Sequence, residues 1–111
     1  MNALSYNCRG LGKGPSVTKL TNLLSRMAPQ VIFLMETKSG RDKMEFIRRK
    51  LGYSGCFTVD SVGSAGGLCL LWEEGIVVDV QSYTRHHIDA EVQLGEAPKW
   101  RFTRMYGWPK S

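Results

Sequence analysis

The sequence has no apolar run longer than five residues, although it contains 111 residues in all. A membrane-spanning helix needs about 20 apolar residues, so we expect none. The first ten residues, MNALSYNCRG, have neither a basic start nor an apolar core, so we expect no secretory signal peptide. Cysteine is scarce: three residues without a CxxC pair argue against a disulfide framework or a zinc site and favour an intracellular location.

Internal repeats and low-complexity tracts are also absent, which favours a single domain over residues 1–111. Hydrophobic residues make up 42% of the chain, enough for a packed core, so we do not expect intrinsic disorder. Lys and Arg number 15 against 10 Asp and Glu, giving a formal net charge of +5. This balance suits a polyanionic partner, nucleic acid first, although an ordinary basic surface has the same composition.

The first half of the sequence alternates between strand and helix patterns. Apolar residues at helical spacing predict a helix from Ser16, as the N-cap, to about Met27, and a second helix over residues 41–51. A short strand is predicted at residues 3–7. The apolar run at residues 31–35 predicts a strand that is covered on both faces.

After Gly52 the apolar period changes from 3.6 to 2, which predicts strands joined by turns. The clearest alternation is IDAEVQL, where apolar and polar residues point to opposite faces. The fold class we expect is therefore α+β: strand, helix, strand, helix, then an antiparallel meander. The strands predicted in this half are residues 55–61, 67–72, 76–83, 88–94 and 100–106.

Polar side chains end three of the predicted strands: Asn7, Glu36 and Tyr106. Ligand sites in sheets of α/β type lie at the carboxyl ends of strands. Glu36 directly follows five apolar residues, so its carboxylate is partly desolvated unless it is paired or bound to a cation such as Mg²⁺. The alternatives are a turn asparagine, an acid that pairs with Lys38 or begins a helix, and a core tyrosine.

Two other motifs carry less information. The glycine-rich residues 10–14 follow a strand and precede a helix, but Pro15 stands where a dinucleotide-binding fingerprint needs its third glycine. We therefore interpret them as a flexible connection. His86 and His87 are adjacent in a predicted strand region, so their side chains point to opposite faces and do not bind one metal ion.

Four segments together resemble a known family: residues 4–12 (LSYNCRGLG), 33–38 (FLMETK), 66–72 (GGLCLLW) and 101–107 (RFTRMYG). In order and spacing they are similar to the N-terminal part of the endonuclease/exonuclease/phosphatase superfamily. The resemblance is strongest to the apurinic-type endonuclease domain of plant non-LTR (LINE-type) retrotransposons. It implies the N-terminal half of a four-layer α/β/β/α sandwich, truncated, in which a mostly antiparallel sheet carries helices on one face.

The resemblance also implies a chemistry: Mg²⁺- or Mn²⁺-dependent hydrolysis of phosphodiester bonds, DNA as partner and a nuclear location. The family's metal-binding glutamate falls on Glu36, its active-site asparagine on Asn7 and its phosphate-contacting tyrosine on Tyr106. Arg9 stands where some members carry an aspartate. A guanidinium there suits phosphate or the DNA backbone rather than a metal ion.

The family's later Asp-x-Asn and Asp-His motifs do not occur in this sequence. We therefore expect a catalytically incomplete centre that binds Mg²⁺ weakly. We also expect the chain to end where the second sheet should begin, so that apolar residues of the predicted meander face water and promote self-association through the exposed sheet face. These residues are Ile88, Val92, Trp100 and Phe102.

Two alternatives to an incomplete endonuclease remain. The chain could be a basic nucleic-acid-binding module without catalysis, acting through Arg9 and through the basic end of the second predicted helix, Arg48, Arg49 and Lys50. A solvated basic helix face has the same pattern. The chain could also be a relic without a selected function.

Overall fold

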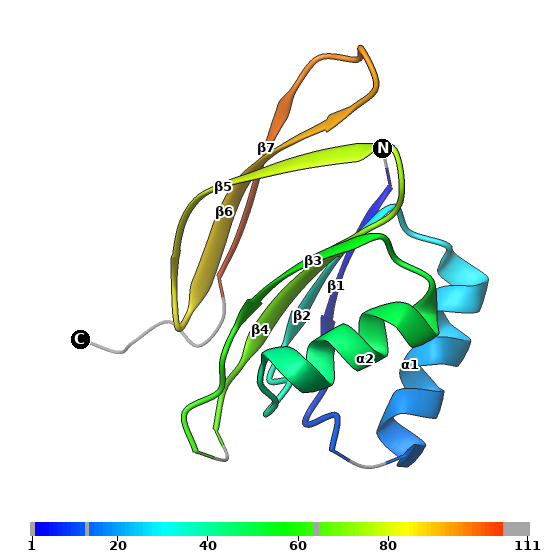
Figure 1. The fold of residues 1–111 in the computed structure, drawn as a ribbon, viewed down its shortest axis with the longest axis vertical. Coiled ribbons are helices and arrows are strands. Elements are labelled where there is room, and N and C mark those ends of the chain that lie inside the picture. Colours follow the sequence, from blue (N-terminus) through cyan, green and yellow to red (C-terminus); the bar gives the residue numbers. More distant parts are fainter. Residues whose placement is uncertain (1, 13, 64, 106–111) are drawn as a thin grey trace.

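The chain alternates strands with helices in its first half and forms strands and turns in its second half (Figure 1). The computed structural model describes residues 2–12, 14–63 and 65–105, which form seven strands and two helices. The elements in chain order are β1 (Ala3–Asn7), α1 (Gly14–Met27), β2 (Val31–Met35), α2 (Arg41–Leu51), β3 (Gly55–Val59), β4 (Leu68–Trp72), β5 (Ile76–Thr84), β6 (His87–Leu94) and β7 (Trp100–Met105).

The first sheet has four strands in the order β1-β2-β4-β3. β1 and β2 are parallel, and α1 is the crossover that a parallel pair requires, whereas β4 runs antiparallel to both of its neighbours. Strand β2 is covered on both faces, as its continuous apolar run predicted. Ile32 and Leu34 pack beneath the helices, Val31 and Phe33 face the second sheet, and all four are fully buried.

Both helices cover the same face of this sheet (Figure 1). Helix α1 buries Val17, Leu20 and Leu24, which recur at the spacing of one helix face. Helix α2 buries Met44 and Ile47 in the same way. The amphipathic pattern of each helix therefore matches its contact with the sheet.

The ends of the helices differ from the sequence prediction in two places. Helix α1 begins at Gly14 rather than after an N-cap at Ser16, because the fixed φ and missing N–H of Pro15 are tolerated in a first helical turn. Met27, in the last turn of α1, is 48% exposed, although it continues the apolar spacing of Val17, Leu20 and Leu24. The C-cap of α2 is Gly52, which is left-handed with φ 83°.

The second sheet is an antiparallel meander in the order β5-β6-β7. Only residues 73–75 separate β4 from β5, and across this turn the chain passes from one sheet to the other. Ile88, Val92 and Phe102 are 0, 0 and 1% exposed, and Trp100 is half-buried. The prediction that these four residues face water is therefore wrong.

The two sheets pack face to face and bury the apolar side of the meander between them. The rings of Phe33 on β2 and Phe102 on β7 have centroids 6.5 Å apart. The apolar face that would have promoted self-association is thus covered by the chain's own first sheet. Period-2 alternation identified the apolar face of the meander, but it did not identify what covers that face.

The described residues form three layers: helices, the four-stranded sheet and the three-stranded sheet. The outer face of the second sheet is mostly polar, although Val77 is exposed on it. Asp89 pairs with Arg101 at 2.6 Å and accepts a hydrogen bond from the Thr103 hydroxyl at 2.9 Å. The hydrogen bond from Arg101 is the main reason that the pKa of Asp89 falls to about 2. Neither helix in this part of the chain is long and apolar enough to cross a membrane.

Candidate functional site

The carboxyl ends of β1 and β2 meet at one end of the sandwich. Asn7 pairs with Met35, so Glu36 follows directly at the same edge. Leu68, the first residue of β4, also pairs with Met35, so the loop between β3 and β4 lies there too. We term this the Glu36 end. It comprises residues 7–11, 36–38, 60–63, 65–68 and the turn 84–87.

Several non-glycine residues at the Glu36 end have backbone conformations that residues with a Cβ rarely adopt. Four non-glycine residues have positive φ in the described part of the chain, and three of them lie here: Arg9, Glu36 and Lys38, each at 52°. The left-handed region is unfavourable for residues with a Cβ, and such residues cluster at functional sites. The local strain therefore marks this end as a candidate site.

Backbone hydrogen bonds fix the segment around Glu36 from both sides. The N–H of Gly10 donates to the Glu36 carbonyl at 2.7 Å. On the other side, the N–H of Lys38 donates to the Gly66 carbonyl, also at 2.7 Å. Glu36 is thus held between the loop after β1 and the loop before β4, which offsets the cost of its backbone conformation.

Gly67 lets the loop before β4 approach the segment around Glu36 closely. Its φ is 94°, and a Cβ built on it would meet the Thr37 hydroxyl too closely for any real contact. The N–H of Thr37 donates to the Gly67 carbonyl at 3.1 Å, so the two backbones are pressed together. Thr37 is fully buried, and its Oγ1 has no hydrogen-bond partner among the described residues. Only glycine fits at position 67 without moving Thr37.

The Asn7 side chain is oriented by its own loop. Its Oδ1 accepts a hydrogen bond from the Arg9 N–H at 3.0 Å, which is an Asx-type turn. This contact agrees with the turn-asparagine alternative, and it also fixes the amide in one direction. Asn7 and Arg9 line an open groove of about 510 Å³ together with Ser16 and Lys19 of α1. The groove therefore presents an amide and two cationic side chains.

The Cys8 thiol lies beneath this edge and is buried. Burial is the main reason that the pKa of Cys8 rises to about 12, and the negative charge of Glu36 raises it further. Cys8 is therefore a neutral thiol at physiological pH and is not a nucleophile.

The metal-binding capacity of this end is limited to few donors. No group of three His, Cys, Asp or Glu side chains that could hold a metal ion occurs in residues 2–12, 14–63 and 65–105. Glu36 offers a carboxylate and Asn7 an amide oxygen, both hard donors of the kind that Mg²⁺ accepts. By themselves these two do not make up a magnesium centre. Tyr106, the third predicted site residue, lies outside the described residues.

The predicted nucleic-acid-binding residues of α2 lie at the opposite end of the first sheet. The chain leaves α2 and reaches β3, where the Ser54 N–H donates to the Trp72 carbonyl at 3.0 Å. Trp72 pairs with Val31, the first residue of β2. Arg49 and Lys50 are exposed there. The structure thus brings Asn7, Arg9 and Glu36 together and places the basic end of α2 far from them.

Arg48 has structural contacts at that end. Its guanidinium pairs with Glu45 at 3.0 Å and donates through Nη1 to the Tyr53 carbonyl at 2.8 Å. These bonds tie the last turn of α2 to the loop that follows it. Arg49 and Lys50 have no such contacts in the described part of the chain and are the more available cations.

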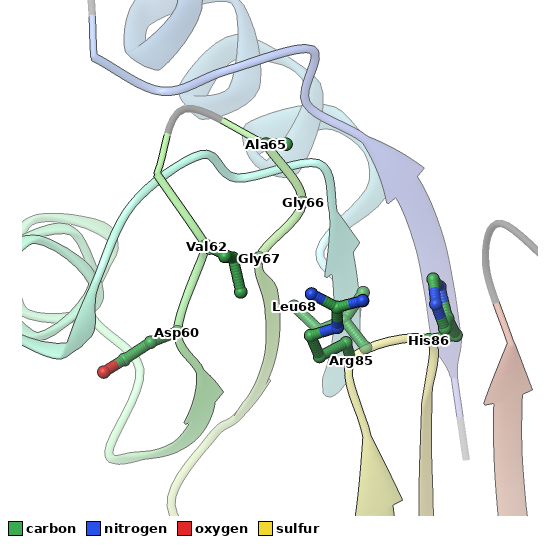
Figure 2. Close-up of a pocket in the computed structure, with 8 residues that line it drawn as sticks. All are labelled: Asp60, Val62, Ala65, Gly66, Gly67, Leu68, Arg85 and His86. Atoms are coloured by element: carbon green, nitrogen blue, oxygen red, sulfur yellow. The ribbon is translucent and has the colours of Figure 1, made fainter.

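Two sets of contacts between the sheets were not predicted from the sequence. Arg85 and His86 form the turn between β5 and β6 and line one pocket together with the loop between β3 and β4 (Figure 2). Arg104 on β7 donates through Nε to the Ser5 hydroxyl on β1 at 2.9 Å. These contacts join the two sheets, so they depend on how the sheets stack and are invisible to local patterns.

Neither a protein-family model nor a curated protein matches the sequence. Among solved structures, the chain is similar to the AP endonuclease LMAP from Leishmania major, with a TM-score of 0.61 and 14% sequence identity. The match covers 92% of this chain and 38% of that chain. At this identity the likeness concerns the fold. The expected α+β sandwich with helices on one face is confirmed, and it corresponds to part of an AP endonuclease-like fold.

Proposed function

We propose that residues 1–111 are the N-terminal part of an endonuclease/exonuclease/phosphatase domain. In this proposal the domain is a truncated, metal-dependent phosphodiesterase of plant LINE-type retrotransposon origin that is catalytically incomplete as this chain and acts on nuclear DNA. The resemblance of four sequence segments and the likeness to an AP endonuclease fold support it. The observation that carries it is the placement of Asn7 and Glu36 at one edge of the sheet, where the backbone of Glu36 has a positive φ and hydrogen bonds hold its segment from both sides.

Each site residue has a role in this proposal. Glu36 supplies one ligand of a Mg²⁺ or Mn²⁺ ion, whose chemistry is to polarise the scissile phosphate. Asn7 orients the phosphate through its amide, and Arg9 binds the nucleic-acid backbone by charge-assisted hydrogen bonds. Tyr106 donates its hydroxyl to a phosphate oxygen. A single carboxylate holds Mg²⁺ weakly, so a working centre would need further acidic ligands.

Metal binding and DNA nicking test this proposal together. Mn²⁺ added to the ¹⁵N-labelled chain should broaden the amide resonances around Asn7 and Glu36, and Glu36→Ala should remove the broadening. Because the centre is incomplete, nicking of supercoiled plasmid in Mg²⁺ should not exceed the background seen with EDTA or with Glu36→Ala.

Glu74→Ala is the matched control, because it removes an exposed acid from the turn after β4. It should leave the Mn²⁺ broadening unchanged. Broadening that is centred elsewhere, or that persists in Glu36→Ala, contradicts the site. Strong nicking that requires both metal and Glu36 contradicts the incompleteness alone. A genomic reading frame that continues into Asp-x-Asn and Asp-His motifs would support the assignment of a partial domain.

A second candidate function is nucleic-acid binding without catalysis, which the exposure of Arg49 and Lys50 and the small set of metal donors favour. Affinity for a DNA duplex should then fall as the salt concentration rises and should not require Mg²⁺. Arg49→Glu should weaken binding. It should also lower the salt slope, the steepness with which log affinity falls with log salt concentration, by about 1 or more, since each phosphate contact contributes about 0.9. Arg48 is left intact because its contacts hold the end of α2.

Lys99→Glu, an equal charge change in the exposed turn between β6 and β7, is the control for this measurement. It should shift the affinity less than Arg49→Glu does. Equal shifts from the two variants would mean that binding reflects net charge alone. In that case the basic end of α2 is not a binding surface.

A further inference from the structure

A cavity of about 250 Å³ opens at the Glu36 end, between the β3–β4 loop and the β5–β6 turn (Figure 2). Its wall is mostly apolar, with Val62 and Leu68 on the loop side. Arg85 and His86 form the opposite side. Small-molecule sites usually start at about 300 Å³, so the cavity suits a group the size of one nucleotide's base or sugar.

The polar groups of the cavity favour an anion. Arg85 is exposed and forms no ion pair with any residue that the structure describes. Its guanidinium points toward the side formed by Gly67 and Leu68, whereas the Asp60 carboxylate points away from it (Figure 2). An apolar wall can take a base or sugar, and an exposed guanidinium beside it can bind the phosphate.

The cavity wall is also connected to Glu36. The carbonyls of Gly66 and Gly67, both in the wall, accept the N–H groups of Lys38 and Thr37. A group that occupies the cavity therefore lies against the β3–β4 loop, and this loop is hydrogen-bonded to the two residues that directly follow Glu36. The positive φ of both glycines fixes the shape of this wall.

We propose that this cavity is a nucleotide subsite, which takes one unstacked nucleotide of a single-stranded nucleic acid. The phosphate binds Arg85, and the base or sugar lies against Val62, Leu68 and the ring of His86. The inference rests on the proposed function in one respect: only if Glu36 binds the scissile phosphate is the nucleotide in the cavity the neighbour of that phosphate. Binding at the cavity itself requires neither metal nor cleavage.

Titration of a single-stranded octanucleotide containing 2-aminopurine, in EDTA, tests the subsite. The wild-type chain should quench the fluorescence as the base contacts His86. Arg85→Gln should weaken binding about tenfold, as expected for loss of a charged hydrogen bond, and should lower the salt slope by about 0.7. His86→Ala should weaken binding about tenfold, with the slope unchanged at pH 8, because it removes a stacking partner.

Arg26→Gln is the charge-matched control, since Arg26 is exposed in the last turn of α1, away from the Glu36 end. It should change the affinity less than twofold. The subsite is overturned if Arg85→Gln and Arg26→Gln weaken binding equally, or if His86→Ala retains the full quenching. Failure of the metal proposal would not produce either result, because EDTA is present throughout and Glu36 is intact.

Discussion

Phe102→Ala should lower the free energy of unfolding by about 3–5 kcal/mol. The Phe102 side chain is 1% exposed between the two sheets. Its ring lies 6.5 Å from that of Phe33 and 5.9 Å from that of Trp100, and the Arg104 guanidinium covers it at 4.6 Å. Domains of this size are stable by only about 5–15 kcal/mol, so the loss is a large part of the total. Urea unfolding followed by tryptophan fluorescence measures it.

Phe46→Ala provides the comparison, because Phe46 lies on α2 and is 53% exposed. Its removal should change stability by no more than about 0.5 kcal/mol. Equal costs for Phe46→Ala and Phe102→Ala would show that the second sheet does not bury its apolar face against the first. The expectation that the meander faces water would then be correct after all.

Gly67→Ala should destabilise the chain by about 3 kcal/mol, combining a left-handed backbone cost of about 1–2 kcal/mol with overpacking of about 1–3 kcal/mol. The new Cβ would meet the Thr37 hydroxyl, and Thr37 is fully buried. Movement of Thr37 would break its bond to the Gly67 carbonyl and release the segment that carries Glu36. Urea unfolding gives the cost, and amide hydrogen exchange at Thr37 and Lys38 gives the local loss of protection.

Gly66→Ala separates the two contributions. Gly66 also has positive φ, at 75°, but a Cβ there meets nothing within 4 Å. Its substitution should therefore cost only the backbone term, about 1–2 kcal/mol. If both variants cost the same, contact with Thr37 contributes nothing, and the two loops are not pressed together as described.

The elements that the sequence predicted well are those with a complete local pattern. Residues 31–35 are uniformly apolar because β2 is covered on both faces, and IDAEVQL alternates because β6 has one buried face and one polar face. Boundaries were less accurate. The serine at position 16 resembled an N-cap, but the proline before it allowed α1 to begin two residues earlier.

What local patterns did not predict is the stacking of the sheets. Ile88 and Phe102 were correctly placed on one apolar face, yet nothing in their own strands identifies β2, β3 and β4 as the cover. For the same reason the sequence did not place Arg85 and His86 in one pocket with the loop between β3 and β4, which lies about 20 positions earlier. Contacts between distant segments depend on topology, which short windows of sequence do not contain.

The candidate site was predictable in part. Asn7 and Glu36 each follow a strand pattern, and the parallel pairing of β1 and β2 brings them to one edge together with Arg9. Their proposed chemistry stays a prediction. Arg48 was grouped with Arg49 and Lys50 by charge alone, whereas its contacts with Glu45 and the Tyr53 carbonyl depend on the geometry of the helix end.

The rate at which the Glu36 end opens can be measured through the buried Cys8 thiol. Cys8 and Cys69 are covered in the native fold, and Cys56 is partly accessible. Because Cys8 is buried, a thiol reagent reaches it only when the first strand and its loop separate from the rest, and its raised pKa keeps the covered thiol neutral. The time course of Cys8 labelling, with Cys56 already blocked, therefore counts spontaneous openings of the Glu36 end. A bound nucleotide or metal ion that slows the labelling of Cys8 must hold the Glu36 end closed.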